Sequence, residues 1–543
     1  MNHYNVVSTF SQDIQKEFKV RIAGQYYTNK KIVDIILKSF FQQDLTHIYR
    51  QEKLKIIDPF AGDGRLITWF IEQWIFLKLP SIKWDIYLID LDTEGLEIAK
   101  NNLQKMKEIG IDLNIYCEKG DTFKLSKKYI EEFDVVLTNP PWELLKPDYH
   151  ELKELNNIEK DKYIFSLKDY DTFLSKEYPL SQPKNKFAGW GTNLSRVGLE
   201  VSYNLCKKNG YMAIILPASF FADEQSLGLR KEIFLNCKVE EIFYYPAEAK
   251  LFGKADIVSS AFLAKKSLKG VGLTKLTLFD KNMQLKSSSK IELTLDDDRN
   301  FLIPISLGGD AIKVLKKMKR GLNTWEELEK KHNEFWAGRE LDETRSKEWL
   351  VNNKELNFKF IKGRMIHRYK IVENPSMYIN KENWKPSKRV SNIRIAWRDV
   401  SRQSQKRRLI SMLIPKNVVA GNSLNTVVYN DNDESSMYAL LGIMNSLCFE
   451  FQLKCYLSTS HISLSAIRKV CIPQQKELKK FTCLIAAVKN KLQNIDTSEA
   501  LIEAIVAKKI YNLNKKELFL VLNTYDKLSI DEKENIINEY EYL

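Results

Sequence analysis

The residues Asp-Val-Val-Leu-Thr-Asn-Pro-Pro-Trp at positions 134–142 decide the expected fold. A short β-branched run that stops at two prolines is typical of a buried strand ending in a rigid turn, because neither proline can donate to a neighbouring strand and each fixes its own φ. Open α/β sheets bind ligands at the carboxyl edge of such strands. The side-chain amide of Asn139, the carbonyl of Pro140 and the ring of Trp142 would form a flat slot there, and that slot suits a planar amine.

A strand, a glycine-containing turn and a helix are expected upstream of this turn. Residues 54–57 are predicted to form a buried strand, and Asp-Pro-Phe-Ala-Gly-Asp-Gly at residues 58–64 joins it to a helical pattern over residues 67–77. The turn is not of the GxGxxG form, and the chain has no GK[ST] for a phosphate loop. The turn therefore favours a nucleoside-bearing ligand without a pyrophosphate.

Acidic residues also follow the next predicted strands. Asp90 ends a strand over residues 85–89, and Asp121 follows a strand over residues 114–117. A carboxylate at the end of the second strand can accept hydrogen bonds from both hydroxyls of a ribose. Because the carboxyl ends of parallel strands meet at one edge, the polar strand-end residues are expected to line one pocket. These residues are Asp58, Asp90, Asp121 and Asn139.

The alternation of strands and helices continues to about residue 264 and predicts a Rossmann-like α/β sheet of about seven strands with crossover helices. A long insertion over residues 143–191 is expected to form a lid or a substrate-contacting loop. Residues 270–300 are polar and rich in Lys and Asp, which indicates a boundary. We expect a catalytic domain at residues 1–300, a mixed α+β domain at residues 301–475 and a helical segment at residues 476–543.

The positive charge is concentrated in the second predicted domain. The formal net charge is +14, and residues 361–410 contain fourteen Lys and Arg against three acidic residues, a local net charge of +11. A solvated face would usually mix the two signs, so the cluster favours a nucleic-acid partner. Trp397 lies in an alternating strand pattern and is expected in the core. The candidate DNA contacts are Arg364, Arg368, Lys388, Arg389, Arg394, Arg398, Arg402 and Arg407.

The sequence predicts neither a membrane segment nor a cysteine-based site. No apolar run approaches the roughly eighteen residues of a membrane span, and the polar opening is unlike a signal peptide, so we expect a cytoplasmic protein. The seven cysteines include no CxxC pair, which argues against a disulfide framework and a zinc site.

In this order the motifs resemble the N6-adenine-specific DNA methyltransferases of bacterial restriction-modification systems, in their gamma arrangement. There a cofactor motif precedes the glycine motif, the catalytic motif follows, and a target recognition domain comes last. The counterparts here are Gly-Gln-Tyr-Tyr-Thr at residues 24–28, residues 58–64, residues 139–142 and the basic domain.

The resemblance implies S-adenosylmethionine as the cofactor and no metal. It places Thr28, Asp58, Ala61 and Gly62 near the methionine end, Asp90 at the ribose and Asp121 at the adenine amine. The residues that it assigns to cofactor binding are Tyr27, Thr28, Asp58, Pro59, Ala61, Gly62, Gly64, Asp90, Asp121, Thr122 and Asn139.

The resemblance assigns catalysis to Asn139, Pro140, Pro141 and Trp142. The family motif usually closes with tyrosine or phenylalanine, so Trp142 is a departure that changes the fit around the target base. Phe252 is the candidate for a second ring that stacks on the base.

The resemblance also implies flipping of the target base out of double-stranded DNA, association with the nucleoid through DNA binding, and a monomer. It leaves open a separate cognate restriction endonuclease. Three alternatives stay open: methylation of cytosine N4, methylation of a protein glutamine amide, and an inactive DNA-binding specificity subunit.

Overall fold

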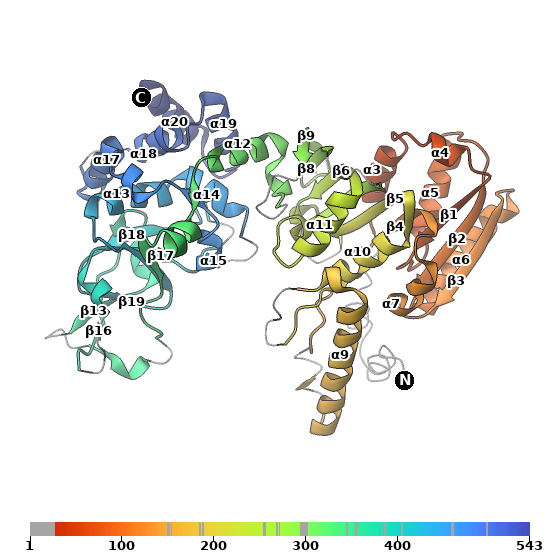
Figure 1. Cartoon of the computed structure of the whole chain (residues 1–543), viewed down its shortest axis with the longest axis horizontal. Helices are drawn as coiled ribbons and strands as arrows, with labels where there is room; N and C mark the ends of the chain where they lie inside the picture. Colours follow the sequence, from red (N-terminus) through yellow and green to blue (C-terminus); the bar gives the residue numbers. More distant parts are fainter. Residues whose placement is uncertain are drawn as a thin grey trace. The chain divides into compact units, whose positions relative to one another are not determined.

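The computed structural model describes residues 28–148, 152–153, 155–183, 186, 189–252, 257–267, 270, 272–293, 302–343, 346–352, 357–382, 384, 387–402, 405–457, 461–495 and 498–543. The chain divides into two compact units, Met1–Gly309 and Asp310–Leu543 (Figure 1). No helix in the described part of the chain is long and apolar enough to cross a membrane.

The first unit is built on a nine-stranded sheet with the strand order β3-β2-β1-β4-β5-β7-β6-β8-β9. The strands from β3 to β5 run parallel, and β7 runs antiparallel between β5 and β6. The strands are β1 (Lys53–Asp58), β2 (Lys83–Asp90), β3 (Leu113–Lys119), β4 (Phe133–Thr138), β5 (Cys206–Pro217), β6 (Cys237–Tyr245), β7 (Ser259–Lys266), β8 (Gly272–Phe279) and β9 (Leu285–Leu293). The first seven strands confirm the predicted Rossmann-like sheet.

The last two strands extend the sheet where the sequence predicted a boundary. β8 pairs parallel to β6, and β9 pairs antiparallel to β8. Polar residues dominate β9, Leu-Lys-Ser-Ser-Ser-Lys-Ile-Glu-Leu. An edge strand buries little of its surface, so its composition resembles that of a loop. The expectation for residues 270–300 is corrected for this reason.

Helices cover the sheet and place the strand ends. They are α3 (Lys30–Phe40), α4 (Thr46–Tyr49), α5 (Arg65–Phe76), α6 (Thr93–Glu108), α7 (Thr122–Leu125), α9 (Asn157–Glu177), α10 (Leu194–Leu205) and α11 (Leu227–Asn236). The apolar stripes of α3, α5 and α6 share one core cluster with β1, β2 and β4. α10 packs on β4 and β5, and α11 packs on β6. All six residues of β4 are buried, as expected for a central parallel strand.

The insertion after β4 contains a long helix rather than only the loop that we expected. α9 starts with a capping box, in which Asn156 and Glu159 satisfy each other's backbone N–H groups. The apolar and aromatic residues that α9 buries recur at helical spacing: Tyr163, Leu167, Tyr170 and Leu174. Figure 1 shows α9 extending away from the sheet beyond α7 and α10.

The second unit combines small sheets with a helical C-terminal part. Two four-stranded sheets have the orders β11-β20-β17-β18 and β12-β16-β13-β19. The strands are β10 (Asn323–Thr324), β11 (Phe335–Gly338), β12 (Leu350–Val351), β13 (Phe358–Ile361), β14 (Ile366–His367), β15 (Lys370–Ile371), β16 (Tyr378–Ile379), β17 (Arg394–Arg398), β18 (Ser411–Ile414), β19 (Val418–Ala420), β20 (Leu424–Tyr429) and β21 (Cys471–Ile472). The helices are α12 (Gly309–Lys319), α13 (Glu434–Met444), α14 (Leu447–Lys454), α15 (Leu464–Ile467), α16 (Gln475–Leu478), α17 (Thr482–Leu492), α18 (Glu499–Ile505), α19 (Lys515–Asn523) and α20 (Ile530–Tyr542). Trp397 is fully buried, which confirms its predicted place in the core.

Candidate active site

A side-chain hydrogen bond ties β1 to β4 where both strands end. Asp58 ends β1, Thr138 ends β4, and both are fully buried. Thr138 Oγ1 donates to Asp58 Oδ1 at 2.5 Å. In the next residue, Asn139 Nδ2 donates to Thr28 Oγ1 at 3.1 Å, just before α3. The backbone before Asn139 and the side chain of Asn139 are therefore both held by remote segments of the chain.

Asp58 is a fully buried acid at this edge, and its pKa is strongly raised. Its Oδ1 also accepts from the backbone N–H of Phe60 at 3.1 Å, whereas its buried Oδ2 has no hydrogen-bond partner among the described residues. Burial raises the pKa of Asp58 to about 7, and the charges of Asp90 and Asp63 add to the rise, against the two hydrogen bonds. A cation or a strong donor placed at Oδ2 would satisfy this carboxyl group.

The glycine turn is held against the second strand end. Gly62 N–H donates to Asp90 Oδ2 at 2.7 Å, and Ala61 N–H donates to the carbonyl of Ile89 at 3.1 Å. Gly62 has φ +51°, and a Cβ added there would meet no atom within 4 Å. Burial raises the pKa of Asp90. The turn thus presents a small residue, Gly62, beside open space and next to the half-buried Asp90.

Gly64 has a packing reason for being glycine. Its φ is +71°, and a Cβ added there would lie 2.5 Å from the Cβ of Ala99 on α6. Gly64 is also the N-cap residue of α5. The close approach of α5 to α6 therefore accounts for this glycine, whatever its role toward a cofactor.

Asp121 is held by a side chain from the insertion. Tyr170 Oη, on α9, donates to both carboxylate oxygens of Asp121 at 3.1 Å each. Burial raises the pKa of Asp121, and the bond from Tyr170 opposes that rise. Beside it, Thr122 Oγ1 donates to the carbonyl of Pro59 at 2.5 Å, which links α7 to the first turn.

The Asn-Pro-Pro-Trp turn rests on a glycine of α10. A Cβ added to Gly198 would lie 2.4 Å from the Cβ of Pro140 and 3.1 Å from the ring of Phe60. Only glycine at this position lets α10 approach the turn so closely. We missed Gly198 in the sequence, although an isolated glycine inside a helical pattern usually marks close packing.

The rings of Trp142 and Phe252 lie against each other. Their centroids are 4.5 Å apart and their planes are inclined by 58°. A base sandwiched between two rings needs about 7 Å between them, twice the van der Waals separation. Phe252 is only 3% exposed, so in this conformation its ring packs in the core against Trp142, and its stacking on a base stays a prediction.

The structure gathers most of the predicted site residues at the carboxyl edge of β1, β2 and β4. Direct hydrogen bonds join Asn139 to Thr28, Gly62 to Asp90, and Thr122 to Pro59. Tyr27 lies outside the described residues. The sequence did not predict the contact of Tyr170 with Asp121, because the helical spacing of Tyr170 on α9 predicts burial but not the side chain to which its hydroxyl donates.

Three of the predicted DNA contacts are buried in ion pairs. Arg394 is fully buried, pairs with Glu340 at 2.6 Å and donates to the carbonyls of Val390 and Val418. Arg368 and Arg407 are each only 10% exposed at the side chain. The prediction of DNA contacts for these three arginines is therefore corrected, because acids from elsewhere in the fold already surround them.

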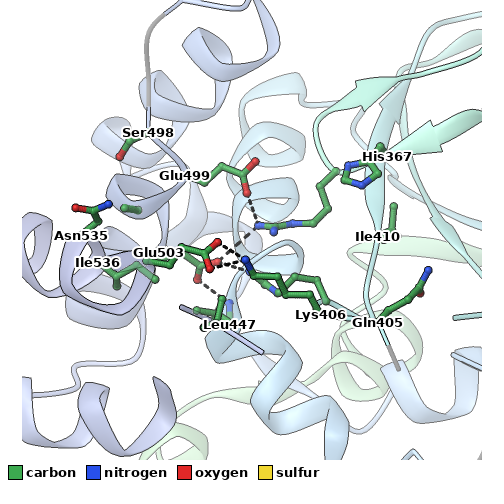
Figure 2. Close-up of a pocket in the computed structure, with 15 residues that line it drawn as sticks. His367, Gln405, Lys406, Ile410, Leu447, Ser498, Glu499, Glu503, Asn535 and Ile536 are labelled. Atoms are coloured by element: carbon green, nitrogen blue, oxygen red, sulfur yellow. Dashed lines mark hydrogen bonds and ion pairs between the residues drawn. The ribbon is translucent and has the colours of Figure 1, made fainter. Parts of the chain in front are cut away.

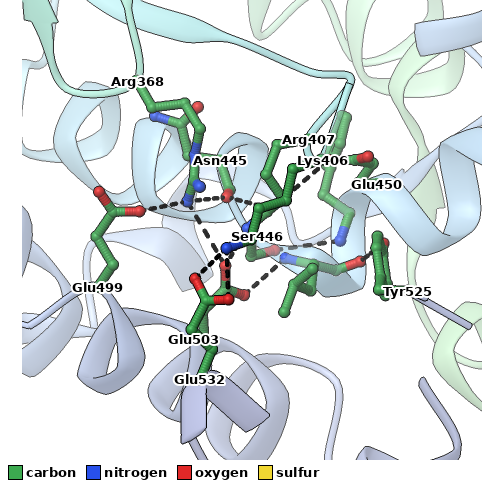
Figure 3. A network of polar contacts seen from close by, with 12 residues as sticks. Arg368, Lys406, Arg407, Asn445, Ser446, Glu450, Glu499, Glu503, Tyr525 and Glu532 are labelled. Atoms are coloured by element: carbon green, nitrogen blue, oxygen red, sulfur yellow. Dashed lines mark hydrogen bonds and ion pairs between the residues drawn. The ribbon is translucent and has the colours of Figure 1, made fainter. Parts of the chain in front are cut away.

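Figure 3 shows the network that holds two of these arginines. Arg407 pairs with Glu450 at 3.0 Å and with Glu503 at 2.8 Å, and Arg368 pairs with Glu499 at 2.8 Å. A cavity of about 520 Å³ adjoins the network (Figure 2). Its lining carries both signs of charge, with Arg368, Lys406 and Arg407 on one side of the balance and Glu499, Glu503 and Glu532 on the other.

The other predicted DNA contacts differ in exposure. Arg398 is half-buried and donates to the carbonyl of Ile366. Arg389 lies over the ring of Trp336, with its guanidinium carbon 4.4 Å from the ring centroid. Four residues of the set are exposed: Arg364, Lys388, Arg389 and Arg402.

Residues 84–252 match the family model described as Eco57I restriction-modification methylase. The Type II methyltransferase M.VspI of Vibrio sp. (strain 343) is 23% identical over 227 residues, which are 42% of this chain and 45% of that protein. The chain thus matches less than half the length of this relative.

Two DNA-bound structures also resemble the chain. The Type IIL restriction-modification enzyme MmeI in complex with DNA has a TM-score of 0.48 at 12% identity, covering 100% of this chain and 78% of that chain. The DrdV–DNA complex has a TM-score of 0.46 at 11% identity, covering 90% and 59%.

Proposed function

We propose that this chain methylates the N6 amino group of adenine in a specific DNA sequence. The match of residues 84–252 to the Eco57I restriction-modification methylase family supports this proposal. The family agrees with the one predicted from the motifs. The observation that carries the proposal is the fixed position of two adjacent residues: Asn139 donates to Thr28, and the preceding Thr138 donates to Asp58. Residues 301–475 would then be the target recognition domain.

The residues of the strand edge fit S-adenosylmethionine as the cofactor. Its amino group would meet the partnerless Oδ2 of Asp58, its ribose hydroxyls Asp90 and its adenine amine Asp121. The open space at Gly62 leaves room for it beside the turn. When bound, the cofactor supplies an electrophilic methyl group.

Asn139 and Pro140 would act on the adenine amine as hydrogen-bond acceptors. The lone pair of this amine is delocalised into the ring, so the amine is a poor nucleophile. If Asn139 Oδ1 and the Pro140 carbonyl accept its two N–H bonds, they favour a pyramidal nitrogen. Because Asn139 Nδ2 donates to Thr28 Oγ1, the acceptor end of the amide, Oδ1, points away from Thr28. Preorganised acceptors and proximity then lower the barrier, and no strongly basic side chain is required.

Trp142 would receive the flipped base on one face. Extruding a base costs a few kcal/mol, and stacking on an aromatic ring returns roughly 1–3 kcal/mol of that cost. Since Phe252 covers part of Trp142 in this conformation, the base would stack on the face that Phe252 leaves open, or the two rings would separate.

Labelled-methyl transfer tests the proposal, followed by mapping of modified bases in DNA from cells that express the chain. We expect N6-methyladenine at one sequence. Asn139→Ala should abolish transfer and leave cofactor binding nearly intact, whereas Asn101→Ala, at an exposed position on α6, should change neither. Full activity of Asn139→Ala, or N4-methylcytosine in place of methyladenine, would refute the assignment.

A further inference from the structure

Four polar side chains from separate segments converge at one edge of the sheet β11-β20-β17-β18. Arg339 follows β11, Asp399 follows β17, and Asn425 lies at the start of β20. Because β20 is antiparallel to both β11 and β17, these strand ends meet at the same edge. His461 joins them through an isolated bridge between its backbone and that of Val400.

Asp399 is the centre of this group. Its Oδ2 accepts from Arg339 Nη2 at 3.1 Å and lies 3.2 Å from His461 Nδ1, and its Oδ1 accepts from Asn425 Nδ2 at 3.0 Å. The backbone of Asp399 is fixed as well, since its N–H donates to the carbonyl of Ser423 and its carbonyl accepts from Ile462. The position of this carboxylate is therefore set by three other segments of the second unit, which are Arg339, residues 423–425 and residues 461–462.

The acid is buried, whereas the two groups that it orients are exposed. The side chain of Asp399 is 10% exposed, that of Arg339 is 54% exposed and that of His461 is 60% exposed. The buried carboxylate of Asp399 needs these hydrogen bonds, and the same bonds fix the directions of the exposed Arg339 and His461 side chains. The bond to Asp399 uses one N–H of Arg339, and the rest of its planar fork is directed by that bond.

Two exposed cations lie close to the group, Arg402 in sequence and Arg364 through a contact of its neighbour Gly363. Arg402 is exposed three residues after Asp399. Arg364 is 70% exposed and pairs with Glu373 at 3.2 Å, and its neighbour Gly363 donates to the hydroxyl of Ser423 at 2.9 Å. These less constrained cations suit DNA phosphates, which fix position without reading sequence.

We propose that Arg339 and His461 contact base edges of the DNA target, with Asp399 as their positioning residue. The inference rests on the proposed function. A side chain oriented by a buried carboxylate has the fixed direction that base readout needs, and the arginine fork matches the paired acceptors of guanine in the major groove. Both residues lie outside the basic region at 361–410, so the charge pattern did not reveal them.

Mapping of methylated sites in DNA from cells expressing Arg339→Lys tests this inference. Lysine keeps the charge but lacks the fork, so we expect sites with one altered base to be methylated and the preference for the wild-type site to fall by roughly 5- to 100-fold. The control is Arg320→Lys, an exposed arginine after α12, which should leave the sites unchanged.

Asp399→Asn should relax the base preference at the same position of the target site as Arg339→Lys does. The reason is that it weakens the bond from Arg339 that orients the guanidinium, whereas Asp399 itself does not contact DNA in this proposal. Cofactor binding and thermal unfolding of each variant show whether it folds, and the exposed Arg339→Lys decides the question if Asp399→Asn does not fold. An unchanged site preference for Arg339→Lys overturns the inference alone. A wild-type chain that methylates no DNA overturns the proposed function together with it.

Discussion

Replacing Gly198 by alanine should displace the Asn-Pro-Pro-Trp turn. The new Cβ would lie 2.4 Å from the Cβ of Pro140, whereas ordinary contacts begin at 3.4 Å, so α10 and the turn must separate by about 1 Å. Overpacking of this kind costs about 1–3 kcal/mol of stability. A misplacement of about 1 Å at a reacting group can cost on the order of a hundredfold in rate. We therefore expect a large fall in kcat for the proposed methyl transfer and a lowered Tm.

Two measurements separate this effect from a general loss of folding. Gly272→Ala is the matched control, because a Cβ there meets no atom within 4 Å. Cofactor affinity of Gly198→Ala should change much less than kcat, since the strain falls on the turn. Alanine favours a helix interior over glycine by about 1 kcal/mol. A Gly198→Ala variant with raised Tm and unchanged kcat would therefore refute the packing argument.

Three further predictions follow from single contacts. Burial raises the pKa of Asp58 from 3.8 to about 7, so between these pH values the folded state holds a proton that the unfolded state has lost, and stability should fall as pH rises from about 4 to about 7. Chemical denaturation of Asp58→Asn without cofactor should show a weaker dependence of stability on pH. A dependence identical to that of the wild type would contradict the raised pKa of Asp58. Tyr170→Phe removes the hydrogen-bond donor to Asp121, a bond worth about 1 kcal/mol, and should weaken cofactor binding roughly fivefold. The kcat at saturating cofactor should be nearly unchanged. Titration calorimetry measures the cofactor Kd, and an unaltered Kd would show that Tyr170 has no part in the site. Arg394→Ala leaves Glu340 buried without its ion-pair partner and should lower the free energy of unfolding in urea by about 3–5 kcal/mol. Arg364→Ala, at an exposed position, should change the free energy of unfolding little. Equal effects of the two substitutions would contradict the burial argument.

The strand-end motifs could be predicted because their signals are local. The apolar run of β4 and the two prolines after it specify a strand and its end through the backbone preferences of those residues alone. The same holds for the turn at residues 58–64. Such local signals recur along residues 54–264, which is why the sequence sufficed for the first seven strands.

The sequence by itself determined the order of motifs, the type of sheet and the set of polar groups at its edge. Only the tertiary structure decided which distant residues touch them: Gly198 beneath Pro140, Tyr170 on Asp121, and Phe252 against Trp142. The net charge of +11 over residues 361–410 is the clearest case. Glu340, Glu450 and Glu503 neutralise its buried arginines from far along the chain. Backbone preference acts between neighbours in sequence, whereas burial and charge pairing act between neighbours in space, and the latter exist only once the chain has folded.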